Sequence, residues 1–244
     1  MTGLRQTWQV SLRYFRVILR QPAFLLITIV QPLIWLLLFG ALFKGVTQIP
    51  GFASGSYLDF LTPGVVVMLA VSSAGWTGMG FIEDINSGVM DRMLVTPAWR
   101  GAFNLGSIAQ CVVSVVLQTL LIIGLALLMG AEVAHVGVLL LVAALLAAAF
   151  ASLSNGLGVL MRQRESLIGA VSLLLLPLTF LSSALMQLSL APGWIGTVAK
   201  FNPVDWAAVA ARDPDLLRIG LLAGLTLLSA WFATRAFAVY QRSL

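Results

Sequence analysis

Long uncharged runs alternate with short charged segments along this chain. The uncharged runs are residues 23–43, 60–82, 101–131, 133–161, 166–199 and 219–234. A membrane-spanning helix needs about 20 consecutive apolar residues, and the first five runs reach that length. The sixth is shorter, but Arg218 and Arg235 flank it and can extend to the membrane interfaces. We therefore expect an all-α integral membrane protein with six transmembrane helices.

The fifth run is too long for one helix. Residues 166–199 would form a helix of roughly 51 Å, against a hydrocarbon core of about 30 Å. The sequence places the break near Pro192 and Gly193. Trp194, Val198 and Phe201 then follow at i, i+4 and i+7 spacing. This spacing predicts a short extracellular helix before the sixth span, with an apolar stripe in the membrane interface.

The first 22 residues have an amphipathic helical pattern. Apolar side chains share one face of the predicted helix, at Leu4, Trp8, Leu12, Phe15 and Leu19. Four arginines lie on the neighbouring face, and Pro22 ends the helix. Such a helix lies along the inner leaflet with its arginines among the lipid phosphates. Contact with anionic lipid and contact with a partner protein are both open for it.

Composition and charge agree with a membrane protein. Of all residues, 60% are hydrophobic and 9% are charged. The net charge of +5 reports topology in this class, and no nucleic-acid partner is expected. If six spans alternate, ten of the 14 lysines and arginines fall on the side of both termini, which predicts cytoplasmic termini. No repeat or linker divides the chain, so residues 1–244 are expected to form a single membrane domain, with the spans in 23–244.

Small residues and a proline mark expected points of close packing and bending. The second run carries Gly75 and Gly78, and the fourth carries Ser154 and Gly158. Because small side chains let membrane helices approach closely, these positions predict seams inside the bundle. Pro177 lacks a backbone N–H and predicts a kink in the fifth run.

Side chains suited to catalysis or to proton transport are scarce. The single histidine, His135, has no second histidine or nearby cysteine with which to bind a metal. Ser152 and Ser154 have no histidine at similar depth to activate them. The sequence contains no G-x-x-x-x-G-K-[ST] loop, so active transport would draw its energy from another subunit. An ion-coupled secondary transporter that binds sodium through backbone carbonyls, and a membrane anchor subunit, stay open as alternatives.

A charged island, residues 83–97 (EDINSGVMDRMLVTP), separates two of the uncharged runs. Glu83, Asp84, Asp91 and Arg92 lie within ten residues of one another. A membrane protein places such a cluster where the chain meets water, and often where it meets a partner. The island is therefore the first candidate for a functional contact.

The order of short motifs resembles the permease (transmembrane) subunits of the type-2 ATP-binding cassette (ABC) transporter family, close to its drug-resistance and lipo-oligosaccharide export branch. The resemblance covers nearly the whole chain. Its landmarks are Gln31-Pro32, residues 36–40, Tyr57, Phe60, Pro63-Gly64, Glu83, Asp84, Gly88, Asp91-Arg92, Thr96-Pro97, Arg100, Pro177, residues 180–182, Pro192, Trp194, Asn202-Pro203 and Arg212.

The resemblance implies how such a chain is driven. The loop after the second span would form a cytosolic coupling helix, about residues 84–97, that docks on a cytosolic ABC ATPase. The residues expected to couple to the ATPase are Glu83, Asp84, Gly88, Asp91, Arg92, Met93, Leu94 and Pro97. Asp84 or Ser87 would cap the start of that helix, and Pro97 would stop it. Two ATPase subunits would bind ATP and Mg, and this chain itself would hold no cofactor, metal or catalytic residue.

The resemblance also implies a cargo and a partner chain. A six-span permease pairs with itself or with a sister subunit, in a bacterial cell membrane, to enclose a path. The first, second and fifth spans would line it, through Gln31, Trp35, Phe39, Trp76, Met79, Phe180, Ser183, Met186 and Gln187. These side chains carry no charge, which suits a hydrophobic or amphipathic substrate. The expected function is export of such a compound with ATP hydrolysed by the separate subunit.

Overall fold

A computed structural model describes residues 22–42, 56–88 and 101–242 of the chain. These residues form helices and irregular connections, without a strand among them. In chain order the helices are α2 (Pro22–Leu42), α3 (Tyr57–Gly75), α4 (Gly78–Asn86), α6 (Gly101–Leu128), α7 (Val136–Met161), α8 (Arg164–Phe180), a 3₁₀ turn (Leu188–Leu190), α9 (Gly193–Ala199), α10 (Pro203–Arg212) and α11 (Leu216–Arg242). Residues 1–21 of the expected amphipathic helix lie outside the described residues.

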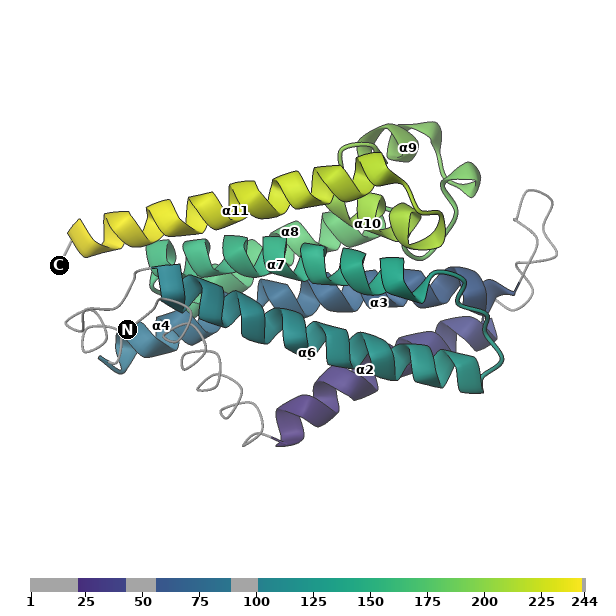
Figure 1. The fold of residues 1–244 in the computed structure, drawn as a ribbon, viewed down its shortest axis with the longest axis horizontal. Helices are drawn as coiled ribbons and strands as arrows, with labels where there is room; N and C mark the ends of the chain where they lie inside the picture. The colour runs from purple at the N-terminus through teal and green to yellow at the C-terminus, as the bar shows by residue number, and fades with distance from the viewer. Residues whose placement is uncertain (1–21, 43–55, 89–100, 243–244) are drawn as a thin grey trace.

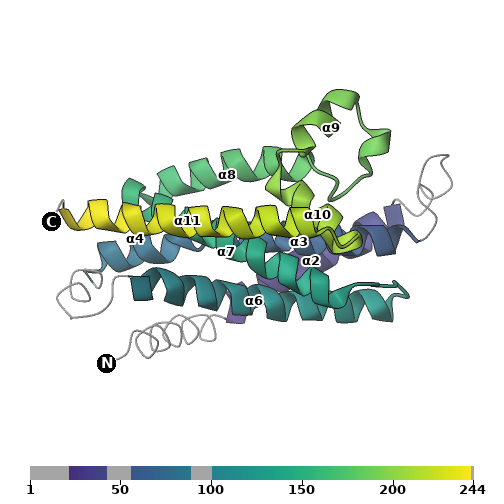
Figure 2. The ribbon, with the colours of Figure 1, turned by 45° about the horizontal axis from the view of Figure 1, so that its top comes forward.

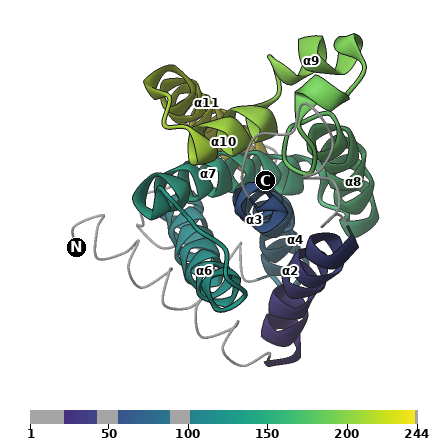
Figure 3. The same cartoon turned by 90° about the vertical axis from the view of Figure 1, so that its right-hand side faces the viewer.

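The long helices run side by side along one axis of the molecule (Figure 1). The end of α4, the start of α8 and the last turns of α11 gather at one end, which we call the α4 end. The short helices α9 and α10 lie at the opposite end, which we call the α10 end (Figures 1 and 2). Seen down the axis, α3 and α7 occupy the centre, and α2 and α8 lie on the same side of α3 (Figure 3).

Helix α7 is the centre of the bundle because its buried side chains are small. It contacts α3, α4, α6, α8, α10 and α11. Ala143, Ala147 and Ala151 are fully buried, and Ser154 is 2% exposed. A Cβ atom on Gly158 would stand 2.6 Å from the carbonyl oxygen of Gly78, so the two backbones touch at this crossing. The seams predicted from small residues are therefore confirmed for the second and fourth runs.

The start of α3 is fixed by a local hydrogen-bond motif. The hydroxyl of Ser56 accepts from the N–H of Leu58, and Oδ2 of Asp59 accepts from the N–H of Ser56 at 3.2 Å, a capping box. The other oxygen of Asp59 accepts from the N–H of Glu132 at 2.7 Å. Asp59 thereby joins the start of α3 to the connection between α6 and α7, at the α10 end.

Four described segments are long and apolar enough to cross a membrane: Tyr57–Asn86, Asn104–Leu128, Val136–Met161 and Leu216–Ala238. The helix α2 occupies the first expected run, and its residues Leu33–Leu42 form a shorter apolar helix. The helix α8 occupies the fifth run but has only 17 residues. The all-helical membrane class is thus confirmed, with four segments meeting the length and composition of a span.

The break predicted near Pro192 was wrong. Helix α8 ends at Phe180, far before that proline, and Pro177 lies in its last turn. The hydropathy pattern missed this end because the residues after Phe180 are also uncharged. The short helix predicted to follow Pro192 is present as α9, with Trp194, Val198 and Phe201 exposed by 60%, 41% and 79%.

Candidate functional site

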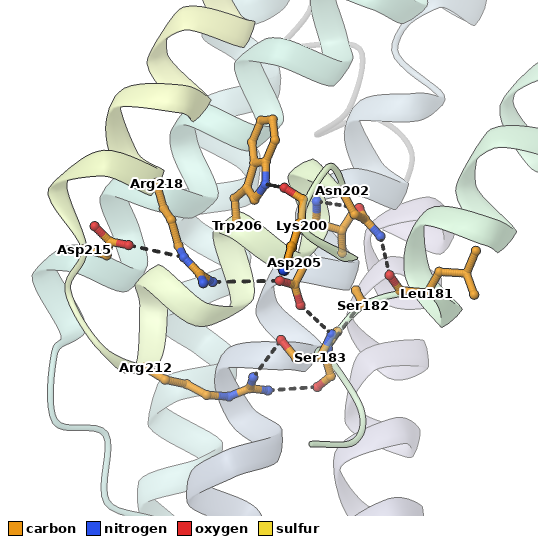
Figure 4. Close-up of polar contacts among 12 residues, drawn as sticks. Leu181, Ser182, Ser183, Lys200, Asn202, Asp205, Trp206, Arg212, Asp215 and Arg218 are labelled. Atoms are coloured by element: carbon orange, nitrogen blue, oxygen red, sulfur yellow. Dashed lines mark hydrogen bonds and ion pairs between the residues drawn. The ribbon is translucent and has the colours of Figure 1, made fainter. Parts of the chain in front are cut away.

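The chain leaves helical geometry beyond Phe180. Residues 181–187 form an irregular segment that lies beside α10 (Figure 4). Ser182, Ser183 and Ala184 within it are 7%, 5% and 0% exposed. Irregular backbone at membrane depth is tolerated only where other protein groups or water satisfy its polar atoms. Three side chains of α10 and its cap meet this requirement, and we call them the α10 clasp: Asn202, Asp205 and Arg212.

Asn202 joins the start of α10 to the end of α8. Its side-chain oxygen accepts from the N–H of Val204 at 2.9 Å, which caps α10. Its amide nitrogen donates to the carbonyl oxygens of Leu178 and Leu181, at 2.7 and 2.8 Å. Leu178 lies in the last turn of α8 and Leu181 directly follows that helix, so no further helical turn supplies donors to these carbonyls. One amide therefore ends one helix and begins another.

Asp205 is a buried carboxylate with a divided role. It is 3% exposed, and its Oδ1 accepts from the N–H of Ser183 at 2.8 Å. Its Oδ2 stands 3.8 Å from Nη1 of Arg218, while Nε of the same arginine lies 3.2 Å from Asp215 (Figure 4). The carboxylate thus holds the irregular segment by a charge-assisted bond and has a cation on its other side.

Arg212 holds two elements at once. Its Nη2 donates to the carbonyl oxygens of Phe60 on α3 and Ala184, each at 3.1 Å, and Nη1 donates to the hydroxyl of Ser183 at 3.4 Å. The guanidinium carbon lies 3.7 Å from the centre of the Phe60 ring, a cation–π contact. Burial lowers the pKa of Arg212 to about 10, an effect that the nearby carboxylate of Asp205 opposes, so the group stays charged at neutral pH.

The irregular segment reaches well into the bundle. The hydroxyl of Tyr57 donates to the carbonyl oxygen of Leu185 at 3.1 Å. Gly64 packs so closely that a Cβ atom there would overlap the carbonyl oxygen of Ala184. Gly64 follows the start of α3 by seven residues, which places this contact about 10 Å along the helix. The clasp and α3 therefore enclose a non-helical piece of backbone inside the α10 end.

The α4 end carries the described part of the charged island. Glu83 forms an ion pair with Arg164 at the start of α8, at 3.0 Å between Oε2 and Nη2. Asp84 is only 6% exposed, and the hydroxyl of Ser87 donates to the carbonyl oxygen of Glu83 at 2.7 Å. Gly88 has a φ of +67°, the left-handed conformation that ends many helices.

This geometry places the first of the residues expected to couple to an ATPase at the end of α4. Asp84 lies inside α4, and Ser87 is the residue that follows its last turn, so neither begins a new helix within the described residues. The remaining residues of the expected coupling helix lie outside the described part of the chain. They are Asp91, Arg92, Met93, Leu94 and Pro97.

The residues expected to line a path lie on α2, in the turn after α3, on α4, at the end of α8 and in residues 181–187. Seen down the axis, α2 and α8 lie on one side of α3 (Figure 3). Trp35 and Phe39 stack on each other, with ring centroids 4.8 Å apart. Trp76 and Met79 are partly buried against the cluster of Ile82, Leu167 and Val171. Gln31 is exposed, as are Phe180, at 61%, and Met186, at 48%. Gln187 is partly exposed and Ser183 is buried. Ser183 therefore belongs to the segment held by the clasp.

Comparison with known proteins decides the family. The ABC-2 type transporter family matches residues 5–214 of the chain. The chain belongs to the ABC-2 type transporter family. A curated relative, the "Daunorubicin resistance ABC transporter permease protein DrrB1" of Streptomyces coeruleorubidus, is 33% identical over 79% of this chain and 68% of its own length. Two proteins named "Putative transport permease ycf38" are also similar. That of Cyanophora paradoxa is 29% identical and that of Porphyra purpurea 28%, each over 82% of this chain and 70% of its own length.

The clasp of this ABC-2 permease was not predicted as a functional site. Asn202-Pro203 and Arg212 served only as landmarks of the resemblance, and Asp205 was not singled out. A signal was present, because an Asp and an Arg seven residues apart on a short helix fall on one face. The sequence could not show that the backbone of residues 181–187, with its hydrogen-bond donors and acceptors, lies beside that helix. Within the described ranges, no three His, Cys, Asp or Glu side chains come together as a metal site.

Proposed function

We propose that this permease is the transmembrane subunit of an ATP-driven exporter that moves a hydrophobic or amphipathic compound out of the cytoplasm. The observation that carries the proposal is the family match over residues 5–214, on a bundle of helices apolar enough to span a membrane. The relative DrrB1 is named for daunorubicin resistance, which supports a drug-like cargo here. A lipid or glycolipid is the alternative amphipathic cargo that we propose.

The side of the bundle formed by α2, α3, α4 and α8 supports an uncharged path. Its described candidates are aromatic, methionine, serine and glutamine side chains, without a formal charge. On α8, Leu173, Leu176 and Phe180 are 74%, 59% and 61% exposed. An apolar face of this extent suits contact with lipid, with a second permease chain or with an apolar cargo. We propose that two such chains, identical or sisters, meet across this side.

The α4 end supports contact with an ATPase. It gathers Glu83 and Arg164, and α4 ends at the charged island. We propose that residues 84–97 dock on a cytosolic ABC ATPase, with two ATPase subunits in the complex. ATP and Mg would be bound by those subunits. In this arrangement α2 and α8 complete six spans, both termini are cytoplasmic and the α10 end faces outward, in a bacterial cell membrane.

Native mass spectrometry of the complex, extracted gently from its host, tests the assembly. Two permease and two ATPase chains are expected. Transport is tested with daunorubicin as the probe, in inverted vesicles that contain the permease and its ATPase. Uptake is expected with ATP in the presence of a protonophore, and not with a non-hydrolysable ATP analogue. Uptake that follows an ion gradient without ATP would instead support a secondary transporter.

A further inference from the structure

The second span is broken between α3 and α4. The turn at Trp76 and Thr77 uses short-range hydrogen bonds: Thr77 donates to Ala74 at 3.1 Å, Met79 donates to Trp76 at 3.1 Å and Gly80 donates to Thr77 at 3.2 Å. These bonds take donors and acceptors that a regular helix would pair four residues apart. The carbonyl of Gly75 and the N–H of Gly78 are thereby left outside the regular ladder.

A side chain of α7 fills this gap. The hydroxyl of Ser154 accepts from the N–H of Gly78 at 2.9 Å and donates to the carbonyl oxygen of Gly75. Insertion of a side chain into the helical ladder is an established cause of helix bending. Ser152, two residues earlier on α7, is equally buried, but its hydroxyl donates to Ala148 of its own helix at 2.7 Å. Ser154 is therefore the serine that joins α7 to the break.

The two halves of the broken span share two neighbours, and among the described residues only α3 is held extensively by further helices. Both halves contact α7 and α8, but in the more extensive helix contacts of the described ranges α2, α6 and α10 pack on α3 and not on α4. Ile82 of α4 packs with Leu167 and Val171 of α8. At the tip, Glu83 pairs with Arg164 on α8 at 3.0 Å. Such an exposed pair adds little stability, so it can break and re-form as the helices move.

We propose that α4 is a lever that carries movement from the ATPase-facing loop to α8, with Ser154 at the fulcrum and Arg164 at the tip as positioning residues. The proposal rests on the proposed function. Movement of α4 about the break displaces α8 through both the buried cluster and the ion pair. The far end of α8 leads into residues 181–187, which the α10 clasp holds. The displacement therefore changes the surroundings of the exposed Met186.

A thiol at position 186 reports this displacement. Met186→Cys is made in the complex of permease and ATPase in lipid nanodiscs, and a polar maleimide measures its labelling rate. The native Cys111 is 4% exposed, so protein without Met186→Cys gives the background. We expect the rate to differ by about threefold or more between the nucleotide-free complex and the complex trapped with ATP and vanadate.

Ser154→Ala is expected to reduce this response toward none, and Arg164→Gln is expected to reduce it in part, because the buried cluster of Ile82, Leu167 and Val171 is left intact. Their matched controls are Ser152→Ala, a buried serine on the same helix, and Glu165→Gln, an exposed charge beside Arg164; both are expected to keep the response. The charge exchange Glu83→Arg with Arg164→Glu is expected to restore it. Because Arg164 lies on the surface, its variant tests the proposal even if Ser154→Ala does not assemble.

The outcomes are distinct. Equal responses in Ser154→Ala, Arg164→Gln and their controls overturn the lever, as does the absence of any response in a complex that hydrolyses ATP. A permease that binds no ATPase refutes the proposed function instead. The fulcrum is then tested on the permease alone, where Ser154→Ala is expected to speed amide hydrogen exchange at residues 78–80 by about tenfold. Exchange equal to that of Ser152→Ala removes the fulcrum.

Discussion

Gly64→Ala is the sharpest test of how the α10 end is held together. A single added methyl group at this position would overlap the carbonyl oxygen of Ala184. The obstacle is backbone, which cannot rotate away as a side chain can. Either the irregular segment or α3 must therefore move by roughly 1 Å or more to regain a normal contact distance.

A shift of that size disrupts the hydrogen bonds of the segment. Ala184 accepts from Arg212 at 3.1 Å, and Ser183 donates to Asp205 at 2.8 Å. Hydrogen bonds weaken steeply beyond the usual range of about 2.7–3.2 Å. Losing bonds to charged groups costs about 1.5–3 kcal/mol each, and overpacking costs about 1–3 kcal/mol, although these terms are not additive. Replacing glycine by alanine in a helix returns about 1 kcal/mol. We expect a net loss of about 2–4 kcal/mol.

The matched control is Gly124→Ala in α6, where nothing lies within 4 Å of the added Cβ atom. Thermal unfolding in lipid nanodiscs compares both variants with the unchanged protein at one heating rate, because unfolding of such proteins is often irreversible. The Gly64→Ala protein is expected to unfold at least about 5 °C lower, and the control within about 2 °C. Equal unfolding temperatures for the two variants would refute the close packing of α3 on the irregular segment.

Three further changes test other contacts by the same unfolding measurement. Arg212→Lys should destabilise by about 1–3 kcal/mol, because a lysine cannot bind the carbonyls of both Phe60 and Ala184 as the planar guanidinium does. Arg235→Lys on α11 is the control and should have little effect. Asn202→Ala should cost about 1–3 kcal/mol through the lost cap and the two freed carbonyls of Leu178 and Leu181; a loss no larger than that of a surface asparagine would contradict this. Glu83→Gln should change stability by less than about 1 kcal/mol, since its pair with Arg164 is exposed, yet lower daunorubicin transport per ATP; full transport would argue against a coupling role.

The sequence alone predicted the helical class and the small-residue seams. Uncharged runs of span length and small residues within them are local features of the sequence. The first indicates a membrane helix and the second a position of close helix packing, whichever helix packs there. The short helix after Pro192 was also visible, because the proline and the apolar spacing lie within ten residues. The proposed coupling and path residues came from resemblance, and they stay predictions.

Only the tertiary structure decided where α8 ends and what holds the chain beyond it. Hydropathy could not show that the helix stops after Phe180, because the residues that follow are uncharged like those of the helix. The polar groups of that backbone are satisfied from a distance: Arg212 binds the carbonyl of Phe60, 152 residues away in sequence. Ser154 likewise meets Gly75 across 79 residues. These side chains hydrogen-bond to backbone groups that are distant in sequence and become neighbours only on folding. A local sequence pattern therefore cannot identify those partners.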